Sequence, residues 1–269
     1  MLQFSRRSPR VWALIFTAVM VFGWATIPPE PEWDGCRAAD LTAVPDTLTL
    51  PAAAQPAPEE KLVCLTFDDG PSKNTPRVLE ILAAEKVPAT FFVIAAENNL
   101  SRLPLIAEEA AAGHQIALHS ACHDYSKIYQ STDAFWQDID LLKERIAPYV
   151  DTAALTTLRF PGGSTNTVSR KYGGKSLMQT LKQQAAEKGY RWVDWNVCAG
   201  DAAGGHPSAS QLVRNVREEA AGKTDCIVLM HDTAVTKNTV EALPDIIRWF
   251  REAGYTFCTI DEFYARRPA

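Results

Sequence analysis

Residues 61–71 read KLVCLTFDDGP, and this stretch decides the fold class. Its first seven residues are mostly apolar, a length that suits a buried strand better than a helix. Two aspartates follow, and Gly70-Pro71 marks a sharp turn. The sequence therefore predicts a strand over residues 61–67 that ends in a pair of carboxylates, Asp68 and Asp69.

The same pattern continues along the chain, with apolar runs separated by helical segments. The predicted strands are 61–67, 89–95, 115–118, 155–160, 190–197, 225–231 and 255–260. The predicted helices are 76–87, 102–112, 132–149, 176–188, 209–221 and 239–253. This alternation implies an α/β fold with parallel strands, either a barrel or an open doubly wound sheet. No glycine-rich phosphate loop follows the first strand, which favours the barrel.

Polar side chains suited to chemistry come directly after the predicted strands. Parallel α/β folds gather such residues at the carboxyl edge of the sheet, where their active sites lie. We therefore expect one shared site that contains Asp68, Asp69, His119, Arg159, Asp201 and His231.

The histidines His119 and His123 are four residues apart, a spacing that places both imidazoles on one face of a helical turn. Two histidines and one carboxylate are typical of a catalytic divalent ion with positions left open for water. The second carboxylate would take a proton from water, and His231 would protonate the leaving group. Arg159 would hold the base carboxylate ionised. These residues predict metal-assisted hydrolysis of an amide or ester.

The net charge argues against a nucleic-acid partner, and the composition divides the chain into three segments. The 269 residues carry 27 Lys and Arg against 32 Asp and Glu, a net charge of −5, so we expect no nucleic-acid partner. Residues 1–27 hold three arginines and a long apolar run, which predicts a signal peptide or an N-terminal membrane anchor. Residues 28–60 are rich in proline and alanine and predict a linker. The folded domain is expected at 61–267.

Four motifs occur in order and resemble one known family. They are Thr66-Phe67-Asp68-Asp69-Gly70, His119-Ser120-Ala121-Cys122-His123, Arg159-Phe160-Pro161-Gly162-Gly163 and Leu229-Met230-His231. Together they are similar to the polysaccharide deacetylases, the NodB-homology domain of carbohydrate esterase family 4. The resemblance implies a distorted, incomplete (β/α)7 barrel with parallel strands. It also implies an enzyme that removes acetyl groups from sugars.

Carried over to this sequence, the resemblance gives each motif residue a role. Asp68 would be the general base, Arg159 its partner, His231 the general acid and Asp201 the residue that orients His231. The metal ligands would be Asp69, His119 and His123, with Zn²⁺ as the expected ion and Co²⁺, Ni²⁺ or Mn²⁺ as alternatives. The backbone N–H of Gly162 would stabilise the oxyanion, and Leu229 would line the acetyl pocket. The chain departs from the family pattern at Gly162, where tyrosine is common, and at Ala202, where tryptophan is usual.

The leading hypothesis is an exported, monomeric deacetylase that acts on an N-acetylglucosamine polymer such as peptidoglycan or a chitin-like glycan. It would contact the membrane only through its N-terminal segment. One alternative is the same chemistry on O-acetyl xylan or on another amide or ester. Another is a catalytically silent domain that binds glycans. A non-haem iron oxygenase would use a similar ligand set, but the paired aspartate and the distal histidine favour hydrolysis.

Overall fold

The computed structural model describes residues 60–202 and 204–268. The predicted signal or anchor segment (1–27) and all but the last residue of the predicted linker (28–60) lie outside the described residues. Within the described ranges, no helix is long and apolar enough to cross a lipid bilayer.

The described residues form a parallel sheet in the order β5-β4-β3-β2-β1-β7-β6, and β8 also pairs with β1. The strands are β1 (Lys61–Asp68), β2 (Thr90–Ile94), β3 (Gln115–Ser120), β4 (Thr157–Leu158), β5 (Arg191–Trp192), β6 (Val197–Cys198), β7 (Asp225–His231) and β8 (Tyr255–Phe257). The longest register joins β1 to β7, from Leu62 with Asp225 to Asp68 with His231. The base candidate and the acid candidate therefore end neighbouring strands at the same height.

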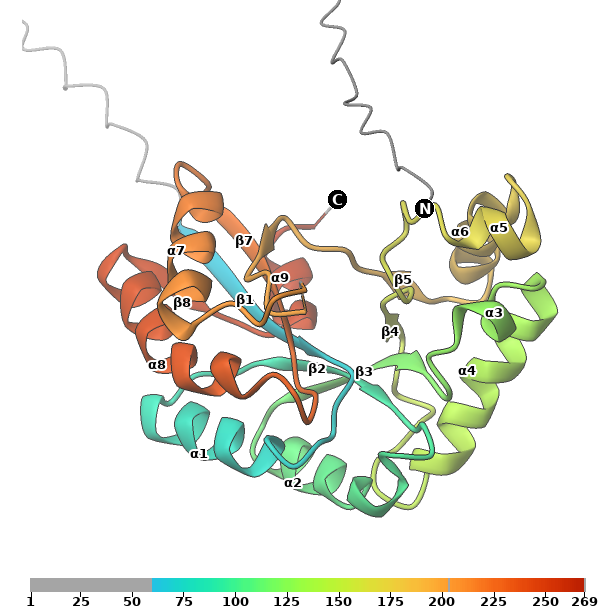
Figure 1. Cartoon of the computed structure of the whole chain (residues 1–269), viewed down its shortest axis with the longest axis horizontal. Helices are drawn as coiled ribbons and strands as arrows, with labels where there is room; N and C mark the ends of the chain where they lie inside the picture. The colour runs from blue at the N-terminus through green and yellow to red at the C-terminus, as the bar shows by residue number, and fades with distance from the viewer. Residues whose placement is uncertain (1–59, 203, 269) are drawn as a thin grey trace, which may run out of the picture. The chain divides into compact units, whose positions relative to one another are not determined.

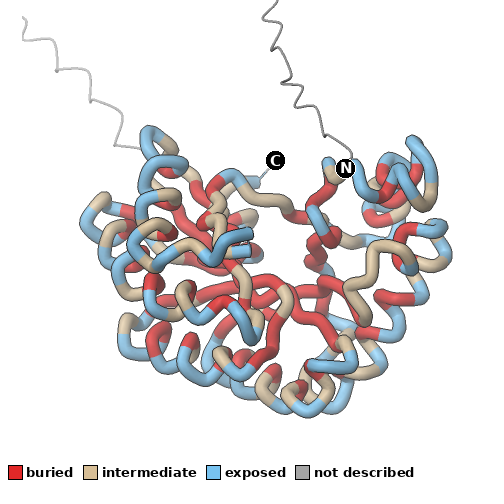
Figure 2. Tube along the Cα trace, in the orientation of Figure 1, coloured by how far each residue is buried: buried red, intermediate tan, exposed pale blue. Residues whose placement is uncertain are grey.

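Helices surround the outer face of this sheet, and Figure 1 shows α1, α2, α4, α7 and α8 around it. The helices are α1 (Thr75–Glu85), α2 (Leu105–Ala111), α3 (Tyr125–Ile128), α4 (Thr132–Ile146), α5 (Ser169–Gly173), α6 (Leu177–Glu187), α7 (Ala209–Ala220), α8 (Lys237–Glu252) and α9 (Ile260–Arg266), with a 3₁₀ turn η1 (Leu100–Arg102). Figure 2 shows that the buried residues concentrate in the strands and on the inner sides of these helices.

The connection between β5 and β6 requires the sheet to curl. These strands lie at the two ends of the seven-strand order, which would separate them by about 29 Å in a flat sheet at about 4.8 Å per strand. The chain from Trp192 to Val197 can span at most about 18 Å. The sheet therefore curves until its edges approach each other, which confirms the expected incomplete barrel.

Side chains of β1 alternate between the two sides of the curled sheet. Val63, Leu65 and Phe67 belong to the large core beneath the outer helices. Leu62 and Cys64 belong to a smaller cluster inside the barrel, together with Phe92 and with residues of α9. Because side chains alternate along a strand, Thr66 and Asp68 continue the inner row.

Helix α9 is attached to the amino-terminal ends of three strands. The N–H of Ile260 donates to Thr90 Oγ1 (3.0 Å), and the N–H of Asp261 donates to the Gln115 side chain (2.9 Å). Thr157 Oγ1 donates to Asp261 Oδ1 (3.0 Å). These contacts fix α9 at the end of the barrel opposite the predicted site.

Two sequence predictions about the strands are wrong. The run 190–197 is not one strand, because residues 193–196 leave the sheet and carry the chain between its edges as β5 and β6. The run 255–260 ends as a strand at Phe257, because Ile260 begins α9. Thr259 and Glu262 form a capping box there, which satisfies backbone donors at the start of the helix.

Glu109 on α2 is fully buried, and neither carboxyl oxygen has a hydrogen-bond partner among the described residues. Burial raises the pKa of Glu109 well above its usual range, and the negative charges of Asp232 and Glu108 add to this. The folded state thus keeps a proton that the unfolded chain releases. The free energy of unfolding consequently falls as the pH rises from the unfolded pKa toward the folded pKa.

Replacing Glu109 by Met should stabilise the domain at pH 8 by about 1–3 kcal/mol, because it removes an unpaired buried carboxyl group. The advantage should shrink as the pH falls toward 5, close to the unfolded pKa of about 4.3, because keeping Glu109 protonated in the folded state then costs less free energy. Urea denaturation at several pH values measures both effects. Glu144→Met, an exposed change on α4, is the matched control. An equal gain from Glu109→Met at pH 8 and pH 5 would contradict the assignment.

Candidate active site

Arg159 lies fully buried inside the barrel. Its Nη1 donates to Asp68 Oδ1 (2.7 Å) and to Thr66 Oγ1 (2.8 Å). Nε and Nη2 donate to the carbonyl oxygens of Val193 (3.0 Å) and Asp194 (3.1 Å). One guanidinium thus holds the carboxylate of Asp68 and the segment that joins β5 to β6.

The turn after β1 directs its two aspartates to different partners. Asp68 ends the inner row of the strand, whereas Asp69 has a φ of 69°, in the left-handed region. The side-chain amide of Asn99 donates to the carbonyl oxygens of Asp69 (3.1 Å) and Pro71 (2.7 Å), which fixes the turn. Nothing in the sequence pattern had marked Asn99, because its role depends on a loop 30 residues away.

His119 and His123 come together by a different geometry from the predicted helical turn. His119 lies in β3, and His123 follows a tight turn with a φ of 50°. Asp138 on α4 accepts hydrogen bonds from the N–H groups of Ala121 (2.9 Å) and Cys122 (3.0 Å), and so holds this turn. The predicted proximity of His119 and His123 is confirmed, but a strand end and a tight turn produce it rather than a helical turn. The supporting role of Asp138 was not predicted from the sequence.

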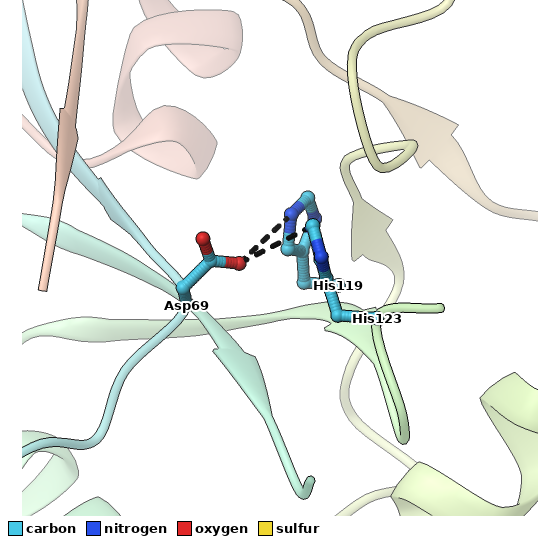
Figure 3. Close-up of side chains that lie close together, drawn as sticks. All are labelled: Asp69, His119 and His123. Carbon is cyan, nitrogen blue, oxygen red and sulfur yellow. Dashed lines mark ion pairs between the residues drawn. The ribbon is translucent and has the colours of Figure 1, made fainter. Parts of the chain in front are cut away.

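The side chains of Asp69, His119 and His123 converge, as Figure 3 shows. Asp69 Oδ1 lies 3.5 Å from His119 Nε2 and 3.4 Å from His123 Nε2. Two atoms that each lie about 2.1 Å from one tetrahedral ion are about 3.4 Å apart. Asp69 Oδ1 is also buried without a hydrogen-bond partner among the described residues. The three donors therefore fit a divalent metal ion.

The protonation of His119 also suits a metal ligand. Burial lowers its pKa, against the opposing influence of the charges on Asp68 and Asp69. Its Nδ1 is 2.7 Å from the carbonyl oxygen of Arg159, which assigns the proton to Nδ1 and leaves Nε2 directed at Asp69.

His231 and Asp201 form the opposite side of the site. Asp201 Oδ1 is 2.8 Å from His231 Nδ1, and Oδ2 accepts from the His231 N–H (2.7 Å) and from Thr239 Oγ1 (2.8 Å). Burial lowers the pKa of His231, but the hydrogen bond and charge of Asp201, with the charges of Asp68 and Asp69, raise it to about 9. His231 is therefore protonated at neutral pH.

The remaining predicted residues lie near these groups. Gly162 has a φ of 77°, and its N–H has no acceptor among the described residues. A Cβ on Gly162 would lie 3.2 Å from the hydroxyl of Tyr125, whose ring packs 5.4 Å from that of His123. Tyr125 therefore supplies an aromatic surface next to Gly162. Leu229 is buried in β7, two residues before His231 and on the same side of the strand.

Comparison with known proteins places this geometry in a family. A family model described as polysaccharide deacetylase matches residues 55–181. The catalytic domain of a peptidoglycan N-acetylglucosamine deacetylase from Eubacterium rectale superposes with a TM-score of 0.71 and 38% identity, covering 76% of this chain and 90% of that one. A peptidoglycan-N-acetylglucosamine deacetylase of Bacillus cereus is 31% identical over 205 residues, 74% of this chain and 69% of the relative. The chain belongs to the polysaccharide deacetylase family.

A third family relative is longer than this chain. The peptidoglycan-N-acetylglucosamine deacetylase of Listeria monocytogenes is 33% identical over 247 residues, which are 89% of this chain and 47% of the relative. The chain thus spans about half the length of this Listeria protein. The family resemblance predicted from the four motifs is confirmed.

Replacing Asp201 by Asn should lower the pKa of His231 by at least about one unit, because the negative charge beside the imidazole is lost. A raised histidine pKa stabilises the folded state fully below the unfolded value near 6.5, and this stabilisation disappears as the pH rises through about 9. The variant should therefore lose stability mainly at neutral and acidic pH.

Titration of the imidazole protons by NMR in chelator-treated protein measures this pKa, with the signal assigned from a His231→Gln variant. Asp225→Asn is the control, because Asp225 pairs with Arg267 rather than with a histidine. An unchanged His231 pKa in the Asp201→Asn protein would refute the role given to Asp201.

Proposed function

We propose that the protein is a metal-dependent deacetylase that hydrolyses N-acetyl groups of N-acetylglucosamine in cell-wall peptidoglycan. The observation that carries this proposal is the buried, unpartnered Asp69 oxygen between two histidine nitrogens, flanked by Asp68 and His231. The named activities of the Eubacterium, Bacillus and Listeria relatives support the same substrate class.

Asp69, His119 and His123 would hold the ion, for which we propose Zn²⁺ because two nitrogens and one oxygen with an open position suit it. When bound, the ion supplies a Lewis acid that polarises the acetyl carbonyl group. The N–H of Gly162 is the candidate donor to the oxygen of that carbonyl as negative charge develops on it.

Asp68 is the proposed general base. Arg159 donates to its Oδ1, and its Oδ2 lies 3.8 Å from His119 Nε2, so this oxygen lies on the side of the metal ligands. Asp68 would take a proton from the attacking water as the water oxygen bonds to the acetyl carbon. The hydrogen bond from Arg159 holds the carboxylate in place for that step.

His231 is the proposed general acid. It carries its proton at neutral pH, and Asp201 fixes the orientation of its ring. His231 would give this proton to the sugar nitrogen as the C–N bond breaks, which releases acetate and a free amine. Leu229 would contact the acetyl methyl group.

We further infer that the reaction takes place outside the cytoplasm. The basic start and apolar run of residues 1–27, followed by the Pro- and Ala-rich residues 28–60, support export through a signal peptide or an anchor. An enzyme that acts on the cell wall would also have to lie outside the cytoplasm.

Metal binding is tested separately from turnover. His119→Ala should weaken Zn²⁺ binding at least about 100-fold, because a direct ligand is lost. Isothermal calorimetry on protein first stripped with a chelator measures the affinity. Asp124→Asn is the matched control, since Asp124 is a neighbouring, partly exposed carboxylate that pairs with Lys127. Equal affinities in the two variants would reject the ligand set.

Turnover is tested by mass spectrometry of acetate loss from defined peptidoglycan fragments with Zn²⁺ supplied. Asp68→Asn should lower kcat by about 10²–10⁴-fold, the usual contribution of a general base, and retain metal binding. Full metal-dependent activity in this variant would exclude Asp68 as the base, and turnover by fully chelated protein would exclude the metal requirement. Faster release from O-acetyl xylan than from N-acetyl substrates would overturn the proposed substrate.

A further inference from the structure

Two cavities adjoin the candidate site. One has a volume of about 290 Å³ and is lined by Asp69, His123, Lys73 and Arg102 among others. The other has a volume of about 320 Å³ and is lined by Asp201 and Lys237 among others. Both contain Lys73 and Ala234 in their walls, so they meet at these residues. We call the two cavities together the rim groove.

The charge of the rim groove is opposite to that of the chain. The sequence has a net charge of −5, yet the lining includes three cations, Lys73, Arg102 and Lys237. Among the described residues that line it, the acids are Asp69 and Asp201 alone, and both have proposed roles within the site. None of the three cations forms an ion pair among the described residues.

The three cations come from loops that follow neighbouring strands. Lys73 follows β1, Arg102 follows β2, and Lys237 begins α8 after β7. The position of Arg102 is tied to the candidate metal ligands, because its N–H donates to the carbonyl oxygen of Asn99 (2.8 Å). The amide of Asn99 in turn binds the carbonyl oxygen of Asp69 (3.1 Å).

The buried carboxylate of Asp232 does not form an ion pair with these cations. Burial raises the pKa of Asp232, and the charge of Arg102 acts in the opposite direction, so the two residues influence each other. However, the carboxylate of Asp232 accepts its hydrogen bonds from the hydroxyls of Ser72 and Thr75. The guanidinium of Arg102 remains available to a ligand in the cavity.

The guanidinium of Arg102 and the ammonium of Lys73, beside the candidate metal ligands, would bind a carboxylate through charge-assisted hydrogen bonds. We propose that the rim groove binds a carboxylate on the sugar next to the reacting N-acetyl group, so that the enzyme prefers an anionic acetylated glycan to a neutral one. This inference rests on the proposed function. It adds which part of the strand the groove recognises, namely the lactyl carboxylate of an N-acetylmuramic acid residue or the carboxylate of an attached peptide.

Four tetrasaccharides of equal length test this preference. They are neutral tetra-N-acetylchitotetraose, the alternating N-acetylglucosamine–N-acetylmuramic acid tetrasaccharide with free lactyl carboxylates, its methyl ester, and the same sugar with short peptides on the lactyl groups. We expect kcat/KM for the free acid to exceed that for the methyl ester at least about tenfold, since one charged hydrogen bond contributes about 1.5 kcal/mol or more. The difference should lie mainly in KM and should decrease at high salt. The peptide-bearing substrate identifies which carboxylate is bound.

The double variant Lys73→Gln/Arg102→Gln keeps side-chain size and polarity but removes both charges. It should abolish the preference of the free acid over its methyl ester. Lys127→Gln, an exposed lysine outside both cavities, should retain that preference. Equal kcat/KM for acid and ester in the wild-type protein, or an unchanged preference in the double variant, would overturn the proposal.

Failure of the proposed function gives a different result. If no tetrasaccharide loses acetate with Zn²⁺ supplied, binding of the free acid and the methyl ester is measured by calorimetry on the wild-type protein and on the double variant. Tighter binding of the acid that disappears in the double variant supports the carboxylate site even without turnover. Equal binding of acid and ester overturns it.

Discussion

Arg159 lies inside the barrel, where its guanidinium bonds to Asp68 on one side and to the carbonyl oxygens of Val193 and Asp194 on the other. A charge buried in this way is strongly unfavourable unless its partners are complete. The guanidinium and the carboxylate of Asp68 therefore each depend on the other. Because the two carbonyls belong to the segment between β5 and β6, the same side chain links the charge of the base to the closure of the barrel.

Two histidines in the same site acquire opposite protonation states from their surroundings. His119 is enclosed on all sides, and this burial lowers its pKa, so that a neutral nitrogen faces Asp69. His231 is also largely buried, but the hydrogen bond and charge of Asp201, together with the charges of Asp68 and Asp69, more than offset that effect. A neutral imidazole suits a metal ligand, and an imidazolium suits a proton donor. The carboxylate of Asp201, which bonds to His231 and not to His119, thus distinguishes the roles of the two histidines.

The sequence allowed the parallel fold, the shared edge and the group of Asp69, His119 and His123 to be predicted, because each motif directly follows an apolar run. Partners distant in the chain could not be predicted. Asp138 supports the turn before His123 from a helix, and no local pattern marks it. The run 190–197 satisfies every local criterion for a strand, but the need to cross between the sheet edges divides it. Tertiary constraints overrode local propensity at these positions.

The central strand β1 shares three residue pairs with β2 but seven with β7, which lies near the end of the chain. Most of its backbone partners therefore become available only after almost the whole domain has left the ribosome. Non-local pairing of this kind delays folding, because a long loop must close before any contact forms. A nascent chain that ends before β7 has its base carboxylate but no acid, and β1 has one side unpaired. Such a chain cannot complete its central sheet, so folding of the domain waits until β7 has been synthesised.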